Sequence, residues 1–134
     1  MSLSKREVLP LKNSNDVVIA RQKVRQWAIE LRFSLVDQTK LVTAASELAR
    51  NALDYGKGGA MTIETISAGT KAGLRLTFED QGPGIADIEQ ALKDGYTTGS
   101  GMGLGLGGSK RLVNEFKIES EVGKGTRVTV ARWK

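Results

Sequence analysis

The sequence predicts an α+β fold, a two-layer sandwich in which helices cover one face of a mixed, mostly antiparallel sheet. Apolar residues recur at the 3.6-residue spacing of a helix over residues 17–31 and 36–55. They alternate with polar residues, as in a half-buried strand, over residues 61–66 and 74–78. Helical patterns that precede hairpin patterns are typical of a sheet with its helices on one side. The length of 134 residues suits one domain over residues 1–134.

The N-terminal part predicts a strand followed by two helices. Residues 7–11 are expected to form a short strand at the edge of the sheet, because Pro10 has no N–H to donate to a neighbouring strand. Residues 13–16 are Asn, Ser, Asn and Asp, which cap helix N-termini, so the first helix begins there. Glycines at the end of the second helical segment terminate it, since glycine readily adopts the backbone found after a helix.

The C-terminal half predicts two hairpins separated by a glycine-rich segment. The two alternating segments form the first hairpin. A short helix is expected over residues 85–93, and another over residues 109–114 after the glycines. The last hairpin has its strands at residues 117–122 and 126–130, on either side of a Gly-Lys-Gly turn at residues 123–125.

The composition excludes several classes of protein. The chain has no Cys and no His, which rules out a disulfide framework, a Cys-ligated metal, a Ser-His-Asp triad and a phosphohistidine relay within it. The net charge is +5, but residues 41–99 carry five basic and eight acidic groups, which argues against a continuous nucleic-acid surface. No apolar run reaches the ~18 residues of a membrane span and the first residues do not resemble a signal peptide, so we expect a cytoplasmic protein.

Seven of the 16 glycines fall between residues 95 and 108, in a segment that predicts an anion-binding loop. From Gly101 to Leu106, glycine alternates with large apolar residues, which a solvated linker would not carry. Such a segment can pack on one side and present its backbone N–H groups to an anion on the other. A flexible linker is the alternative. The P-loop pattern is absent, and the G-x-G-x-x-G match at Gly103, Gly105 and Gly108 lacks the strand that should precede it.

Glu47 and Asn51 lie four residues apart on the second predicted helix, so they share one face. Asn51 can supply an oxygen to Mg²⁺ without adding charge, because a nucleotide-bound Mg²⁺ takes few protein ligands. Glu47 then stays free to act as a general base on a hydroxyl group. The alternative is that both residues belong to the solvated face of an amphipathic helix.

Two further motifs follow strand ends. Asp80 begins the segment Asp-Gln-Gly-Pro-Gly-Ile, and a carboxylate there can accept a hydrogen bond from an exocyclic amine such as that of adenine. Gly82 and Gly84 would let the backbone approach a flat ring closely. Thr126 closes the Gly-Lys-Gly-Thr segment of the last hairpin. Each motif alone could be an ordinary polar turn.

Taken in order, E-x-x-x-N on a helix, D-x-G-x-G-I after a strand, G-x-G-L-G-L before a helix and G-x-G-T between strands resemble the four nucleotide-binding boxes of the GHKL (Bergerat-fold) ATPases and kinases. The resemblance covers residues 35–134. The gyrase, Hsp90 and MutL branches need further domains, and a sensor histidine kinase needs a phosphoacceptor His. Segments such as Ser-Glu-Leu-Ala-Arg-Asn at 46–51 look like the RsbT-like switch serine/threonine kinases, with the RsbW-type anti-sigma factors as the alternative.

The resemblance implies a two-layer Bergerat fold and an ATP-dependent serine/threonine kinase that uses Mg²⁺. It implies that Glu47 is the catalytic base, that Asn51 binds Mg²⁺ and that Asp80 anchors adenine. The other nucleotide contacts would be Gly82, Gly84, Ile85, Gly101, Met102, Gly103, Leu104, Gly105, Leu106 and Thr126.

The resemblance also implies a set of partners. The substrate would be a Ser or Thr of a STAS-domain protein in a bacterial stress-response (stressosome) pathway, with a PP2C-type phosphatase or a sigma factor as a further partner. No membrane or nucleic-acid partner is expected. The alternative function is an anti-sigma factor, or a nucleotide-gated binding module that activates a phosphatase without turnover.

Overall fold

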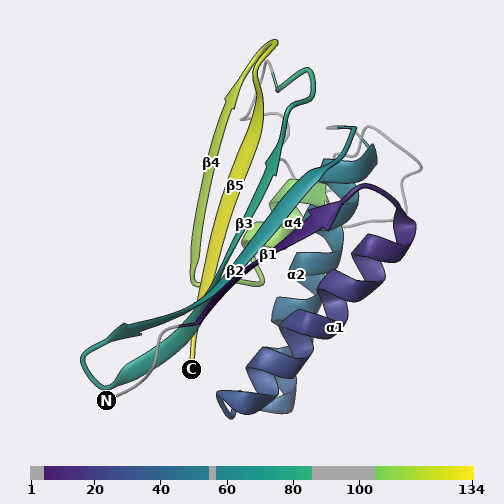
Figure 1. The fold of residues 1–134 in the computed structure, drawn as a ribbon. Coiled ribbons are helices and arrows are strands. Elements are labelled where there is room, and N and C mark those ends of the chain that lie inside the picture. The colour runs from purple at the N-terminus through teal and green to yellow at the C-terminus, as the bar shows by residue number, and fades with distance from the viewer. Residues whose placement is uncertain (1–4, 55–56, 86–104) are drawn as a thin grey trace.

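The structure is a computed structural model that describes residues 5–54, 57–85 and 105–134. In this structure the helices lie on one side of an antiparallel sheet (Figure 1). The elements in chain order are β1 (Arg6–Leu11), α1 (Ser14–Glu30), α2 (Leu35–Asp54), β2 (Gly59–Ala68), β3 (Lys71–Asp80), α4 (Gly105–Lys110), β4 (Glu115–Glu121) and β5 (Gly125–Trp133).

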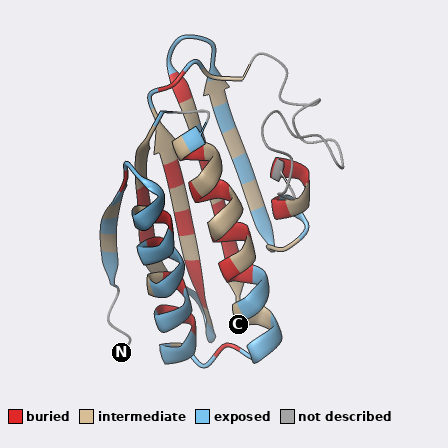
Figure 2. Ribbon diagram, turned by 90° about the vertical axis from the view of Figure 1, so that its right-hand side faces the viewer, coloured by how far each residue is buried: buried red, intermediate tan, exposed pale blue. Residues whose placement is uncertain are grey.

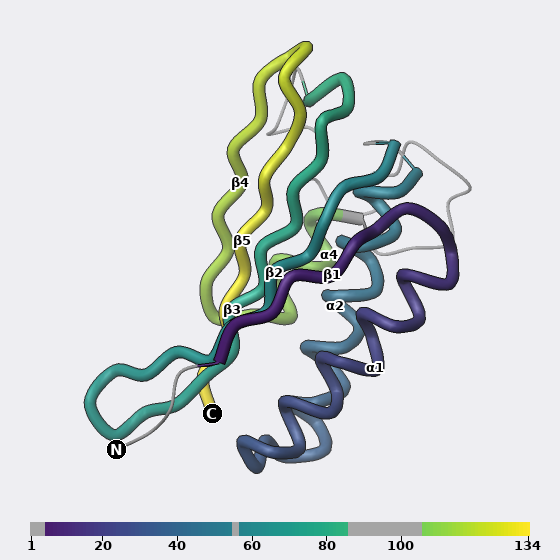
Figure 3. Tube along the Cα trace, viewed as in Figure 1, coloured from purple at the N-terminus to yellow at the C-terminus, as the bar shows by residue number. Residues whose placement is uncertain are grey.

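The five strands lie in the order β1-β2-β3-β5-β4, and each of the four pairings is antiparallel. β5 therefore pairs with both β3 and β4, although the glycine-rich segment separates it from β3 in sequence. The long β2–β3 hairpin extends beyond the helices at its turn (Figure 3). This arrangement confirms the predicted fold class, with β1 at one edge as Pro10 indicated.

The core lies between the sheet and the two long helices (Figure 2). Every second residue of the central strands points to the helices and is buried, as in Met61 and Ile63 of β2 and Leu74, Leu76 and Phe78 of β3. Trp27 of α1 is buried in the same cluster, as the helical spacing predicted. The opposite face of the sheet is charged, with ion pairs such as Arg75–Glu64 at 2.9 Å, so only one face is available for packing.

Side-chain caps start both long helices, the first of them within residues 13–16, where the sequence predicted it. Asn13 precedes α1 and its Oδ1 accepts a hydrogen bond from the backbone N–H of Asp16 at 2.9 Å. Ser34 precedes α2 and its Oγ accepts from the N–H of Asp37 at 3.1 Å. Each cap satisfies one of the N–H groups that a helix leaves free at its start.

Two predicted boundaries after the glycine-rich segment are wrong. The helix expected at residues 109–114 runs from Gly105 to Lys110 instead. It ends early because the N–H of Asn114 donates to the carbonyl of Ala131 at 2.9 Å, which draws the chain into the sheet. Of the helix expected at 85–93, Ile85 is not helical and the remainder lies outside the described residues.

The last hairpin is also shifted from its expected register. β4 ends at Glu121, which pairs with Gly125, so the turn is at residues 122–124 and not at 123–125. Gly123 has a φ of 83°, a left-handed conformation that suits glycine in a tight turn. The shift places Ser120 opposite Thr126.

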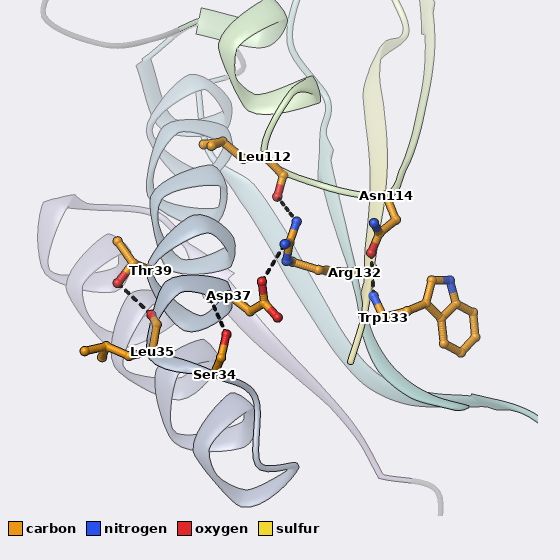
Figure 4. Close-up of polar contacts among 8 residues, drawn as sticks. All are labelled: Ser34, Leu35, Asp37, Thr39, Leu112, Asn114, Arg132 and Trp133. Atoms are coloured by element: carbon orange, nitrogen blue, oxygen red, sulfur yellow. Dashed lines mark hydrogen bonds and ion pairs between the residues drawn. The ribbon is translucent and has the colours of Figure 1, made fainter. Parts of the chain in front are cut away.

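Arg132 of β5 connects the sheet to both α2 and the segment after α4 (Figure 4). Its Nη1 donates to the carbonyl of Leu112 at 2.9 Å, and its Nη2 donates to Oδ1 of Asp37 at 2.5 Å. Nearby, the N–H of Trp133 donates to Oδ1 of Asn114 at 2.7 Å. These contacts connect the C-terminal strand β5 to α2 and to the segment after α4.

Candidate functional site

The elements that carry the predicted site residues come together at one end of the sheet, where β3 ends and β5 begins (Figure 1). Asp80 pairs with Gly59 at the start of β2 and with Thr126 at the start of β5. The C-terminal end of α2 lies at the same end of the sheet, and α4 packs against α2. Elements from four distant parts of the sequence therefore meet at this end of the sheet.

Asp80 is the best-defined polar group at this end. Its Oδ1 accepts a hydrogen bond from the N–H of Gly82 at 3.0 Å, which fixes the carboxylate at the strand end. Partial burial raises the pKa of the Asp80 carboxyl, while the backbone N–H groups of Gly82 and Thr126 act in the opposite direction. Perturbed carboxylates of this kind are concentrated at functional sites.

Thr126 lies beside Asp80, on the neighbouring strand and on the same face of the sheet. Its Oγ1 lies 2.8 Å from Oγ of Ser120 on β4. The Ser120 Oγ also accepts from the N–H of Ile85 at 2.7 Å and donates to the carbonyl of Gly125 at 3.1 Å. Ser120 therefore joins the segment after Asp80 to the start of β5.

Gly82 and Gly84 shape the site in a way that the sequence suggested only in part. Gly82 is buried and its N–H holds Asp80, as described above. Gly84 has a φ of 79°, and a Cβ added there would lie 2.3 Å from the carbonyl oxygen of Glu121. The close approach that requires glycine at position 84 is thus to the backbone of β4.

A cleft of about 310 Å³ opens at this end of the sheet. Asp80, Ser120 and Thr126 line it, together with charged residues from the ends of the strands. Its lining carries carboxylate, hydroxyl and amide groups beside Lys124 and Arg127. The cleft is polar and open, which suits a hydrophilic ligand that enters from solvent.

Glu47 and Asn51 lie one turn apart in the C-terminal half of α2, as predicted. Both are partly exposed, and each is followed in the helix by a buried residue, Glu47 by Leu48 and Asn51 by Ala52. Neither side chain forms a hydrogen bond or ion pair with another residue among those described. Their carboxylate and carboxamide groups are therefore available to a ligand.

The glycine-rich segment is described only from Gly105 onward. Gly105 begins α4, and Leu106 in its first turn is buried in the core. Leu106 thus fixes the segment to the core, as its alternation with glycine suggested. The contacts predicted at Gly101, Met102, Gly103 and Leu104 lie outside the described residues.

Ser120 is a site residue that the sequence analysis missed. The expected turn at residues 123–125 would have paired Thr126 with Val122, which hid the contact between Ser120 and Thr126. The available signal was Gly123 itself. A glycine at the centre of a three-residue turn pairs residue 121 with 125 and residue 120 with 126.

The family model of the histidine kinase-, DNA gyrase B-, and HSP90-like ATPases matches residues 36–134. The chain belongs to this ATPase family. The match begins within α2 and includes the E-x-x-x-N motif, Asp80 and Thr126. The predicted family is confirmed, and an ATPase domain of this family implies the use of ATP.

Two relatives show which members of the ATPase family the chain resembles. The chain is 47% identical over 118 residues to the serine/threonine-protein kinase RsbT of Bacillus subtilis, covering 88% of this chain and 89% of the relative. It is 31% identical over 135 residues to the anti-sigma F factor of Clostridium acetobutylicum, covering 96% and 93%. The first likeness confirms the predicted enzyme class, a serine/threonine kinase.

The fold has a counterpart among solved structures. A crystal structure of the RsbU and RsbW domains of a Mycobacterium tuberculosis protein superposes with a TM-score of 0.66 at 21% identity. The superposition covers 99% of this chain and 33% of that one. At this identity the likeness concerns the fold alone. Within the described residues, no helix combines the length and apolar character needed to cross a membrane.

Proposed function

We propose that the chain transfers the γ-phosphate of Mg·ATP to a Ser or Thr of a STAS-domain protein in a bacterial partner-switching pathway. The observation that carries this proposal is the pairing of Asp80 with Thr126 at the end of the sheet where α2, the helix that carries Glu47 and Asn51, also ends. The likeness to a serine/threonine kinase supports the reaction. The resemblance to RsbT-like switch kinases supports the class of protein substrate.

Asp80 would hold the adenine base. An ionised carboxylate only accepts hydrogen bonds, so it would pair with the exocyclic amine of adenine. The N–H of Gly82 donates to Oδ1, and the second carboxylate oxygen, Oδ2, would accept from the ligand. The sugar and the phosphates would extend from Asp80 toward α2, whose C-terminal end lies at the same end of the sheet.

Asn51 would be the protein ligand of Mg²⁺. No group of three or more acidic, His or Cys side chains that could hold a metal occurs among the described residues. The described residues thus fit an ion that arrives with the nucleotide, whose other ligands are phosphate oxygens and water. The bound ion would neutralise charge on the phosphates. The free carboxamide of Asn51 fits this role because it adds no negative charge.

Glu47 would act as the general base. The hydroxyl oxygen of the substrate forms a bond to the γ-phosphorus, and the bond from that phosphorus to the bridging oxygen breaks, releasing ADP. The hydroxyl proton passes to the Glu47 carboxylate. Glu47 is one helical turn from Asn51, so the base and the metal ligand face the same region.

The test is phosphate transfer from γ-labelled ATP to a STAS-domain protein. Glu47→Gln should reduce transfer by at least about 100-fold, the usual contribution of a general base. Calorimetric affinity for Mg·ATP should change little. Glu7→Gln is the matched control, because Glu7 lies on the edge strand β1 and, among the described residues, its side chain forms an ion pair with Lys23 alone, at 3.4 Å. Full transfer by the Glu47→Gln variant would refute the assigned base.

An anti-sigma factor is the second candidate, favoured by the 31% identity to an anti-sigma F factor over nearly the whole chain. In that case the chain would bind a sigma factor when loaded with nucleotide. A pull-down with ATP, with ADP and without nucleotide distinguishes the two functions. Nucleotide-dependent capture of a sigma factor would favour the second, and capture of only a STAS-domain protein or a PP2C-type phosphatase would favour the first.

A further inference from the structure

Ser120 of β4 makes three polar contacts at the nucleotide end of the sheet. Its Oγ lies 2.7 Å from the backbone nitrogen of Ile85 and 3.1 Å from the carbonyl oxygen of Gly125. The third contact, at 2.8 Å, is to Oγ1 of Thr126. The distances alone leave the donor of this third bond open, because both atoms are hydroxyl oxygens.

Counting protons settles which hydroxyl donates. A serine hydroxyl has one proton and two lone pairs. The carbonyl of Gly125 can only accept, so the Ser120 proton goes there. The N–H of Ile85 occupies one lone pair of Ser120. The remaining lone pair can be used only if Thr126 donates its own proton, and this assignment satisfies all three contacts at once.

Because the hydroxyl of Thr126 donates its proton to Ser120, its oxygen can only accept hydrogen bonds from a ligand. Asp80, its partner in register on β3, likewise offers only acceptors when ionised. Both residues line the cleft. The two side chains together present hydrogen-bond acceptors and no side-chain donor at this point, which suits a ligand group with two N–H bonds.

We propose that Ser120 determines base specificity as a positioning residue: by taking the proton of Thr126, it makes Thr126 an acceptor that, with Asp80, selects the amino group of adenine. This inference rests on the proposed nucleotide site at Asp80 and Thr126. An amino group satisfies both acceptors, whereas a keto oxygen at the same place on the base would meet lone pairs from both sides. Ser120 itself need not touch the base.

The test compares calorimetric affinities for Mg·ATP and for Mg·purine riboside triphosphate. The two ligands differ only in the amino group, so their affinity ratio isolates its hydrogen bonds. The variants are Ser120→Ala, Thr126→Val and the double variant. Ser67→Ala is the matched control, because Ser67 is an exposed strand serine near the turn of the β2–β3 hairpin. Thermal melts establish that each variant is folded.

We expect Ser120→Ala to lower the ratio by about threefold to tenfold, the range for one hydrogen bond. Thr126→Val should lower it by a similar factor. The double variant should lower it no further, since Ser120 acts through Thr126. A loss of affinity for both ligands with an unchanged ratio would mean that Ser120 is only structural and would overturn the inference, as would additive effects in the double variant.

The same experiment separates this inference from the proposed function. If the unaltered chain binds neither triphosphate, the proposed nucleotide site is wrong. If it binds ATP with a clear preference over the purine analogue, and Ser120→Ala keeps that preference, only the role of Ser120 is wrong. Should Ser120→Ala fail to fold, Ser120→Thr restores a hydroxyl at this position, and it must retain the preference for ATP that Thr126→Val loses.

Discussion

The bond between Arg132 and Asp37 allows a quantitative test of how the sheet is held to the helices. The two side chains are 14% and 27% exposed, so water screens them less than a surface pair. The guanidinium of Arg132 lowers the pKa of the Asp37 carboxyl, chiefly through its hydrogen bond. Within the described residues, the Nε of Arg132 has no hydrogen-bond partner, so Asp37 and Leu112 carry its polar contacts.

Asp37→Asn keeps an oxygen that can accept the bond but removes the charge. A hydrogen bond to a charged group contributes about 1 kcal/mol more than a neutral one. A negative charge in the first turn of a helix contributes roughly 0.3–1 kcal/mol, and Asp37 is in the first turn of α2. We therefore expect a loss of about 1.5–2 kcal/mol, which lowers the Tm by roughly 5–10 °C for a domain of this size.

Urea unfolding of the two proteins at several pH values is the assay. A lowered folded-state pKa means that the Asp37 contribution is present above the unfolded value of about 3.9 and is lost as the pH falls through the folded value. The two stability curves should therefore differ at pH 7 and converge below about pH 4. Glu30→Gln, which breaks the exposed pair with Lys5, should cost less. Equal stability at pH 7, or a difference that persists in acid, would refute this account.

Three further predictions concern the glycines, the nucleotide anchor and the core. Gly125 has a φ of 104° and a Cβ there would lie 2.1 Å from the carbonyl oxygen of Asp80, so Gly125→Ala should abolish ATP binding in calorimetry. Gly123→Ala, with a φ of 83° but open space around it, should cost only about 1 kcal/mol in urea unfolding. Because burial raises the pKa of Asp80, affinity for ATP should begin to fall on acidification at a pH above the ordinary aspartate range, and Asp80→Asn should remove this carboxylate's contribution. Leu48→Ala in the core should cost about 3 kcal/mol, whereas Leu35→Ala, at a position 71% exposed, should change the unfolding free energy by less than about 0.5 kcal/mol.

The sequence predicted those features that depend on local pattern. The cap at Asn13 and the helical spacing of apolar residues identified the helices, and the alternation around Met61 and Leu76 identified the central strands. The helical spacing also placed Glu47 and Asn51 on one face of α2, as observed.

The features that were missed depend on contacts between distant segments. The end of α4 is set by the bond from Asn114 to Ala131, which no local pattern indicates. The role of Ser120 required the register of β4 against β5, and the expected turn, one residue too late in the sequence, paired Thr126 with Val122 and concealed it. The salt bridge between Asp37 and Arg132 joins opposite ends of the family match, and both residues look like ordinary surface charges in the sequence.

The pairing of Asp80 with Thr126 also has a consequence for the order of folding. These residues meet only when β5 inserts between β3 and β4, a non-local step that comes after the β2–β3 hairpin can form from neighbouring residues. A ligand bound across β3 and β5 stabilises only chains in which this insertion is complete. Bound nucleotide should then slow the hydrogen exchange of backbone amides in β4 and β5. The exchange of amides near the β2–β3 turn should stay unchanged.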